Sequence, residues 1–377
     1  MLIHYWCPYL TNIATISSVK RSATYLKKFD KNNKINIEII NSYGEWSNAS
    51  LLKDKITINN PLTFINLFNL LPKKKIFSKF SLFVIFILSF FPLLLKLNRE
   101  KPDFLIIHLL TSLPIILSLF LNKKTKVILR ISGLPRLNIF RKTLWKLFNS
   151  RIHLITTPTK ITKNDLIKEK IFNEKKICLL RDPVIEVNNI NNLKKEKFEN
   201  ILLKKNDFYL SIGRFTKQKN FDFLVKEFSE VVDKLKTKKL CIIGDGEQKD
   251  YLKKIIHKYK MQDNIVLLNY QSNPYKFIYN CKAIISVSLY EDPGFVLIES
   301  FYLNKVIISS DSKNGPREMS LENDIGYFFK TNNSEDFKNK LIESEKNSNY
   351  EKILRAKYYS KKFSTFSHYK KIIKLFR

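Results

Sequence analysis

Glycine, cysteine and acidic residues are all scarce in this chain of 377 residues. The four cysteines lie far apart without CxxC spacing. This spacing excludes a zinc ribbon and a disulfide scaffold and is typical of a reducing, cytosolic compartment.

Long apolar runs are missing too. The longest, residues 82–95, is interrupted by Ser89 and Pro92, and it is shorter than the roughly 20 residues that span a bilayer. We expect a buried or interfacial helix there.

Acidic side chains are outnumbered, with 34 Asp and Glu against 67 Lys and Arg and a formal net charge of +33. Such an excess implies a polyanionic partner, either nucleic acid or an anionic membrane. The usual nucleic-acid modules are missing from the sequence, so a basic nucleic-acid-binding protein is kept as an alternative. Residues 61–99 hold six basic and no acidic residues. They suit an interfacial segment on anionic lipid as well as a core helix with solvated lysines.

Strand-like apolar runs alternate with helix-like stretches, for example residues 221–235, whose apolar side chains recur at helical spacing. This alternation predicts right-handed βαβ crossovers and parallel sheets. The expected fold class is therefore α/β, with two doubly wound Rossmann-like domains facing a cleft. The predicted strands are residues 2–6, 35–40, 103–108, 127–131 and 154–157, then 209–213, 239–244, 265–270, 283–288 and 306–311.

The domain organisation is predicted from composition. Residues 187–206 are rich in Asn and Lys and are interpreted as a linker between a first domain, 1–186, and a second, 207–349. The segment 350–377 carries nine basic residues against one acidic residue and is expected to be an amphipathic helix that crosses back to the first domain. Residues 1–6 predict a strand rather than a signal peptide, since a basic n-region and a long apolar h-region are missing.

Six of the eight glycines fall between residues 213 and 326, most of them just after strand-like runs. In the same region Glu291 and Glu299 flank a turn between a strand-like and a helix-like run. Ligands of open α/β sheets bind at such turns, and the first helix amides favour an anion such as a diphosphate. A carboxylate pair around this turn suits a nucleotide-sugar. An isolated pair would be better explained as two solvated glutamates on a capped helix.

The pair is not isolated, because four motifs follow one another in this region. They are S-I-G-R-F-T-K-Q-K-N at 211–220, I-G-D-G-E at 243–247, the E-x7-E turn at 291–299 and N-G-P-R-E at 314–318. Together they resemble the retaining, two-domain glycosyltransferases of the GT-B fold, the group 1 family. The resemblance covers residues 209–330, and the first half is similar only in its pattern.

The resemblance implies a role for each motif. Arg214 and Lys219 would contact the diphosphate of the donor. Because a leaving nucleoside diphosphate gains negative charge, two fixed cations would stabilise the transition state more than the ground state. Glu291 would contact hydroxyls of the donor sugar. The predicted catalytic residues are Arg214, Lys219 and Glu291, and the predicted donor-binding residues are Gly213, Gly244, Gly246, Tyr270, Gly294, Phe295, Val296 and, on the ribose, Glu299.

No two aspartates are spaced D-x-D, the usual metal anchor of the other main glycosyltransferase fold. We therefore expect metal-independent transfer, with Arg214 and Lys219 in place of the cation and with no cofactor besides the donor. Two residues depart from the family pattern. Asn220 replaces the usual glycine at a helix start, and Pro293 is unusual in the E-x7-E turn.

The first half departs further. The loop after the first strand has no glycine, although Thr11, Asn12 and Thr15 offer polar contacts. Ser132 stands where many members carry a histidine. His108 ends a strand-like run and could face the cleft, but a histidine at a strand end is more often structural.

The expected function is a retaining hexosyl- or N-acetylhexosaminyltransferase. It would use a nucleoside-diphosphate sugar, UDP-linked on family grounds, and a glycan or polyprenyl-diphosphate-linked acceptor in polysaccharide assembly. The run 273–275, Asn-Pro-Tyr, resembles members that use N-acetylhexosamines. The expected partners are donor, acceptor and an anionic membrane surface, without nucleic acid, on the inner face of the cytoplasmic membrane. A non-catalytic nucleotide-sugar-binding subunit and phosphorylase- or epimerase-like relatives are the alternatives of the same fold.

Overall fold

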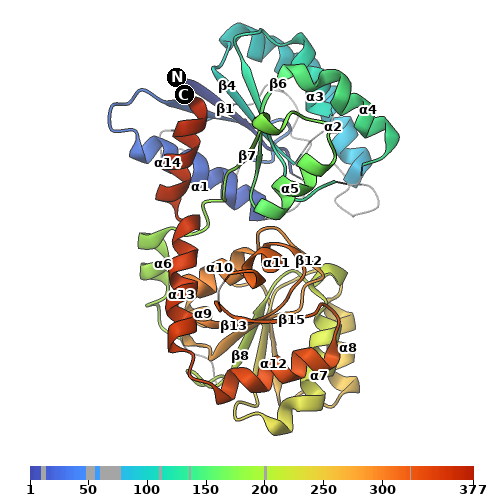
Figure 1. The fold of residues 1–377 in the computed structure, drawn as a ribbon, viewed down its shortest axis with the longest axis vertical. Helices are drawn as coiled ribbons and strands as arrows, with labels where there is room; N and C mark the ends of the chain where they lie inside the picture. Colours follow the sequence, from blue (N-terminus) through green and yellow to red (C-terminus); the bar gives the residue numbers. More distant parts are fainter. Residues whose placement is uncertain are drawn as a thin grey trace. The chain divides into compact units, whose positions relative to one another are not determined.

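The computed structural model describes residues 1–9, 14–47, 56–59, 78–109, 113–135, 137–198, 202–322 and 324–377. These residues form two compact units (Figure 1). Unit 1 comprises Met1–Pro183 with Thr365–Arg377, and unit 2 comprises Val184–Ser364. The segment expected as a linker contains α6 (Val187–Leu193), which belongs to unit 2. The segment 350–377 contains two helices, α13 (Tyr350–Ser360) in unit 2 and α14 (Thr365–Phe376) in unit 1.

Unit 1 is built on a parallel seven-stranded sheet with the order β3-β2-β1-β4-β5-β6-β7. The strands are apolar on both faces, as a sheet covered by helices on both sides requires. Helices α1 and α14 cover one face, and α2 to α5 cover the other. The strands are β1 (Leu2–Trp6), β2 (Asn36–Ile40), β3 (Thr57–Asn59), β4 (Phe104–His108), β5 (Lys126–Arg130), β6 (Ile152–Thr157) and β7 (Ile177–Leu179); the helices are α1 (Ala14–Phe29), α2 (Ser78–Glu100), α3 (Leu113–Phe120), α4 (Ile139–Phe148) and α5 (Lys160–Lys168), with short 3-10 turns η2 (Asn149–Arg151) and η3 (Glu174–Lys176).

Unit 2 repeats this plan in a parallel six-stranded sheet with the order β10-β9-β8-β11-β13-β15. β12 and β14 pair in parallel as a separate two-stranded sheet. The strands are β8 (Tyr209–Ile212), β9 (Leu240–Ile243), β10 (Ile265–Leu268), β11 (Ala283–Ser286), β12 (Tyr290–Glu291), β13 (Val306–Ser310), β14 (Lys313–Asn314) and β15 (Tyr327–Phe329); the remaining helices are α7 (Phe221–Val231), α8 (Lys249–Lys258), α9 (Tyr275–Asn280), α10 (Phe295–Tyr302), α11 (Gly315–Ser320) and α12 (Ser334–Lys346), with 3-10 turns η4 (Lys217–Lys219), η5 (Val232–Lys234) and η6 (Lys361–Phe363).

The predicted fold class is confirmed for each unit, and each of the ten predicted strands is present within one or two residues of its expected ends. Strands β3, β7, β12, β14 and β15 were not predicted. Each has two or three residues, too few to show a period along the sequence. The predicted helix over 221–235 ends earlier, at Val231, and continues as the 3-10 turn η5.

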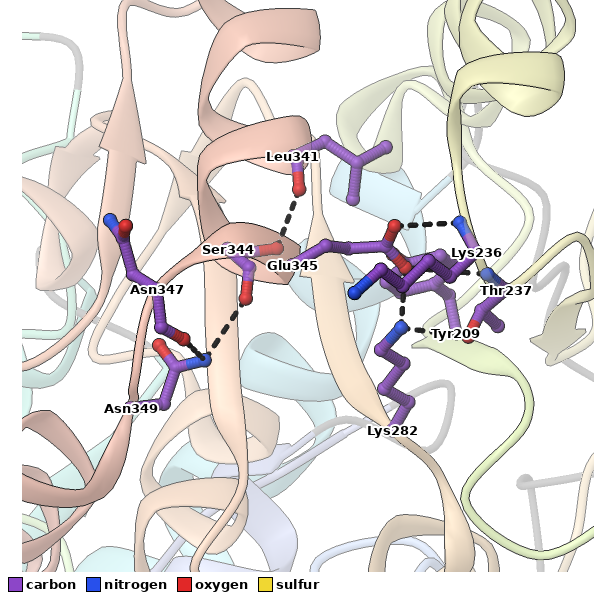
Figure 2. A network of polar contacts seen from close by, with 9 residues as sticks. All are labelled: Tyr209, Lys236, Thr237, Lys282, Leu341, Ser344, Glu345, Asn347 and Asn349. Carbon is purple, nitrogen blue, oxygen red and sulfur yellow. Dashed lines mark hydrogen bonds and ion pairs between the residues drawn. The ribbon is translucent and has the colours of Figure 1, made fainter.

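A buried carboxylate fixes the end of α12 to the sheet of unit 2 (Figure 2). Glu345 accepts hydrogen bonds from the Tyr209 hydroxyl at 2.6 Å and from the Lys236 amide at 2.7 Å, and it pairs with Lys282. Burial raises the pKa of Glu345, but these bonds outweigh it and lower the pKa overall. The charged carboxylate therefore holds α12 against the start of β8 and β11.

The apolar run 82–95 lies in α2, a helix of 23 residues with Pro92 inside it. Its inner face packs on the unit 1 sheet through Phe86, Leu93 and Leu97, while other apolar residues of the same helix are exposed. None of the helices in the described ranges is both long and apolar enough to cross a membrane.

Candidate active site

The order of the strands in unit 2 reverses at β8 and β11, which are hydrogen-bonded neighbours. In open α/β sheets ligands bind at this point, beside the carboxyl ends of the strands. The four sequence motifs lie in the loops that follow β8, β9, β11 and β13. The fold therefore brings segments spread over about a hundred residues to one edge of the sheet.

The loop after β8 places Lys219 across Gly213. A Cβ on Gly213 would lie 2.8 Å from Cε of Lys219, so the lysine side chain can cross here only over a glycine. The next residue, Asn220, has φ +58° and ψ +35°. Asparagine tolerates this left-handed conformation better than other side chains do, which explains how it stands in for the family's glycine. Its side chain also donates to the Val287 carbonyl at 3.3 Å and to Asn332 at 2.9 Å.

Lys219 and Glu291, which are 72 residues apart, form an ion pair. The same carboxylate oxygen accepts a hydrogen bond from the Ser288 hydroxyl at 2.8 Å. The two side chains are only 19% and 15% exposed, so they are partly shielded yet still reachable from solvent. The structure thus joins two of the three predicted catalytic side chains at the edge between β8 and β11.

The turn from Glu291 into α10 is shaped by Gly294, which precedes the helix at φ +92°. Phe295 and Val296 are half-buried in the first turn of α10. Glu299, one turn further, is 7% exposed and accepts a hydrogen bond from the Tyr275 hydroxyl at 3.0 Å. Glu299 is thus held by a tyrosine of α9, the last residue of the Asn-Pro-Tyr run.

The loop after β9 packs directly on the loop after β8. A Cβ on Gly244 would lie 1.9 Å from the Gly213 carbonyl oxygen, and one on Gly246 would lie 2.6 Å from the Phe215 carbonyl oxygen. The Phe215 amide also donates to the Asp245 carbonyl at 2.8 Å. Both glycines of the second motif are therefore required by close backbone approach, and they support the loop that carries Lys219.

The N-G-P-R-E motif supports the Glu291 turn from the other side. A Cβ on Gly315 would lie 1.8 Å from the Pro293 carbonyl oxygen. The Asn314 amide donates to the Tyr290 hydroxyl at 3.0 Å and to Asp292 at 3.1 Å. β14 and β12 pair in parallel at the same place. The motif acts here as a support for the turn, and this role was not predicted from the sequence.

Two predicted site residues are not joined to the others by any contact. Arg214 is exposed, and its guanidinium has no protein partner among the residues that the structure describes. Tyr270 follows the edge strand β10 and is 74% exposed. Both lie in loops on the carboxyl side of the sheet, with side chains open to solvent.

Sequence reasoning also missed two polar residues that hold this turn. Ser288 bonds Glu291 directly, and Gln218 donates to the Tyr290 carbonyl at 2.7 Å. Gln218 lies inside the first motif, so its position was a usable signal. Ser288 closes the predicted strand 283–288, and nothing in the sequence distinguishes it from other strand-end serines.

The first-domain candidates lie in unit 1. His108 is 5% exposed and faces a small interior cavity of about 20 Å³ that is also lined by Arg130, Thr156 and His368. Burial, and then the Arg130 charge, hold the pKa of His108 well below its usual value. Ser132 is exposed after β5, and Thr15 is half-buried in α1. Thr11 and Asn12 lie outside the described residues.

One group of metal-ligand side chains occurs among the described residues, and it lies in unit 1. His4 Nε2 is 3.6 Å from a Glu38 oxygen and 3.4 Å from a Glu100 oxygen. The Lys96 ammonium bonds the two carboxylates at 2.7 and 2.6 Å. Burial and the Lys96 charge lower the pKa of His4 to about 4. Since the Lys96 ammonium already bonds one oxygen of each carboxylate, the group is best described as a buried ion-pair network.

Comparison with known proteins agrees with this geometry. A family model described as "Glycosyl transferases group 1" matches residues 193–363. Over 312 residues the chain is 31% identical to an uncharacterized glycosyltransferase of Methanocaldococcus jannaschii, covering 78% of this chain and 73% of that protein. The chain belongs to the group 1 glycosyltransferases.

Two further proteins are similar to this group 1 chain. It is 29% identical over 196 residues to the N-acetylgalactosamine-N,N'-diacetylbacillosaminyl-diphospho-undecaprenol 4-alpha-N-acetylgalactosaminyltransferase of Campylobacter jejuni, covering 52% of each protein. The crystal structure of Anabaena HepE in complex with UDP has a TM-score of 0.70 at 12% identity and covers 99% of both chains. That likeness shows the fold, GT-B, with a Rossmann-like sheet in each unit.

Proposed function

We propose that this group 1 glycosyltransferase acts in glycan assembly and moves a sugar, with retention, from a UDP-sugar to a glycan or polyprenyl-diphosphate-linked acceptor. The Lys219–Glu291 pair at the edge between β8 and β11 carries the proposal. Membership of the family and the UDP-bound structural neighbour support the donor class. The printed name of the Campylobacter jejuni relative supports a lipid-diphosphate acceptor and an N-acetylhexosamine.

The pair suggests how the donor would bind. In the structure Lys219 and Glu291 neutralise each other. A donor diphosphate would compete for the ammonium, and a sugar hydroxyl would donate to the carboxylate in its place. As the glycosidic bond breaks, the leaving diphosphate gains charge, so Lys219 and the exposed Arg214 would bind it more tightly in the transition state. The proposed attack occurs on the face from which the leaving group departs, so it requires no protein nucleophile.

The test is transfer from a panel of radiolabelled nucleotide-sugars to membrane lipid extracts. We expect Lys219→Met and Glu291→Gln each to lower kcat about 10²- to 10³-fold, as loss of a transition-state contact does. Lys217→Met is the matched control, because Lys217 is an exposed lysine of the same 3-10 turn, and it should retain activity. Full activity in Lys219→Met would refute the cation role, and loss of activity on adding a chelator would refute metal-independent transfer.

A further inference from the structure

Helix α2 of unit 1 is apolar on the side where a surface helix is normally polar. Six of its large apolar side chains are exposed, and at 100° per residue they fall within one arc of about 140°. They are Phe80 (62%), Phe83 (50%), Ile87 (53%), Leu88 (43%), Phe91 (70%) and Leu95 (72%).

Three polar residues of α2 are buried on its inner side, among the apolar residues that pack on the sheet. Ser81 and Ser89 are fully buried, and Lys96 is 6% exposed in its ion pairs with Glu38 and Glu100. A helix that is apolar all round is expected inside a protein or against a bilayer. The outer face of α2 therefore has the polarity of a buried surface while it remains exposed.

Two neighbouring helices extend this surface. α3 contacts both α2 and α4, and the three helices lie side by side on one face of the seven-stranded sheet (Figure 1). The rings of Phe90 and Phe120 meet edge-on at 5.9 Å across α2 and α3. The added exposed residues are Leu119 (37%) and Phe120 (57%) on α3 and Ile139 (86%), Phe140 (72%) and Leu147 (67%) on α4. We name the eleven residues together the α2–α3–α4 surface.

The charge around the α2–α3–α4 surface is mainly positive, and Glu169 after α5, which is partly exposed, is paired with Lys142 of α4 at 2.8 Å. Between residues 78 and 151 the sequence has only two acidic residues, Glu100 and Asp103, and Glu100 is paired with Lys96. Exposed cations border the surface at Arg99, Lys123, Lys124 and Lys146. An apolar face with a cationic border is the pattern of a surface that inserts into an anionic lipid headgroup layer.

We infer that the α2–α3–α4 surface docks unit 1 on an anionic bilayer, with its phenylalanines, leucines and isoleucines inserted between the headgroups. Docking would bring the enzyme to the proposed lipid-linked acceptor in the membrane. In this respect the inference rests on the proposed function. A second copy of the chain is the poorer occupant, because a two-fold contact would place the two cationic borders against each other. Exposed apolar patches of this extent mark interaction sites rather than ordinary surface.

The test is flotation of the full chain with vesicles of phosphatidylcholine alone or mixed with phosphatidylglycerol. We expect binding to the mixed vesicles that weakens with salt. The double variants Phe91→Ser/Leu95→Ser and Ile139→Ser/Phe140→Ser should each weaken it about 10- to 100-fold. Lys123→Gln/Lys124→Gln should weaken binding to mixed vesicles only, about fivefold per charge. Leu321→Ser and Tyr350→Ser, in unit 2 with 75% and 67% exposure, are matched controls and should bind as the parent chain does.

Three results would overturn the inference. One is unchanged flotation by both apolar double variants. Another is equal binding to the neutral vesicles without salt dependence. The third is a concentration-dependent dimer in sedimentation velocity that these variants abolish, which would assign the surface to a second copy. Vesicle binding needs no catalysis, so a chain that floats but transfers no sugar refutes the proposed function alone. A chain that transfers sugar to a soluble acceptor but does not float refutes the docking alone.

Discussion

Lys219 reaches Glu291 because residue 213 has no side chain. In Gly213→Ala the new Cβ would meet the far end of a flexible lysine chain, whereas in Gly244→Ala it would meet a backbone oxygen at 1.9 Å. We expect Gly213→Ala to displace Lys219 and slow transfer about 100-fold, with a loss of stability below about 1 kcal/mol. Gly244→Ala should cost about 3 kcal/mol, because the backbone must shift. Kinetics combined with thermal unfolding separate the two, and equal stability losses would contradict the packing argument.

A chain of hydrogen bonds ends at a second residue of interest, His368 of α14. Its Nδ1 donates to the Arg181 carbonyl at 2.7 Å, so Nε2 accepts from the Ser22 hydroxyl at 2.8 Å, which in turn meets the Tyr5 hydroxyl at 2.8 Å. Burial lowers the pKa of His368 to about 4. The imidazole is therefore neutral in the folded state at neutral pH.

This neutral histidine makes the stability of unit 1 depend on pH. Below about pH 6.5 this histidine binds a proton in the unfolded chain but not in the folded one. The free energy of unfolding therefore decreases as the pH is lowered from about 6.5 and levels off near pH 4. The contribution is on the order of 3 kcal/mol. All three tryptophans, Trp6, Trp46 and Trp145, lie in unit 1, so tryptophan fluorescence in urea measures it. His368→Asn should make this slope shallower, because the lowered pKa values of His4 and His108 in the same unit leave part of it in place, while the exposed His257→Asn should not change it. Parallel curves for parent and His368→Asn would contradict the assignment.

At the scale of elements, helix α12 depends on the Glu345 network shown in Figure 2. Glu345→Ala would leave the Tyr209 hydroxyl without this acceptor and would remove the carboxylate paired with the Lys282 ammonium, which keeps its hydrogen bond to the Thr237 hydroxyl at 2.9 Å. We expect a loss of about 3 kcal/mol, as for a broken buried ion pair. Glu343→Ala, on the same helix but 43% exposed and paired with Lys340, should cost less than about 1 kcal/mol. Hydrogen exchange of α12 measures both, and similar protection in the two variants would contradict the prediction.

The elements also show what could be predicted from the sequence. Ten strands were predicted because each is an apolar run bounded by polar residues. Arg214, Lys219, Glu291 and Glu299 were predicted to share one donor site because their motifs lie at strand ends, and the structure pairs Lys219 with Glu291. The pair β12 with β14 could not be predicted, since two residues show no period and their pairing depends on tertiary contact. The supports of the turn, Ser288 and Asn314, are ordinary residue types whose partners only the fold supplies. For His108 the sequence predicted the strand end correctly and suggested a site residue, but the side chain faces the interior of unit 1.

For the whole molecule, the division into two units gives a test of where the donor binds. UDP at about 100 times its Kd should stabilise the unit that binds it by about 2.7 kcal/mol. The proposed donor site lies in unit 2. UDP should therefore raise the denaturant concentration at which the amides of residues 213–220 and 288–299 lose their protection from hydrogen exchange. The tryptophan transition of unit 1 should move less. An equal shift of both transitions, or protection limited to unit 1, would contradict this placement.

The position of α14 has a consequence for synthesis on the ribosome. Although it follows unit 2 along the chain, α14 packs in unit 1, where Phe376 lies 4.4 Å from the ring of Phe104 and Ile372 joins the same core. Domains usually fold as they emerge, the earliest first. Here the nascent first unit must wait with one sheet face partly uncovered until residues beyond 364 have been translated, while the later-made second unit can close before it. We expect the first unit to be the one that needs chaperone protection during translation.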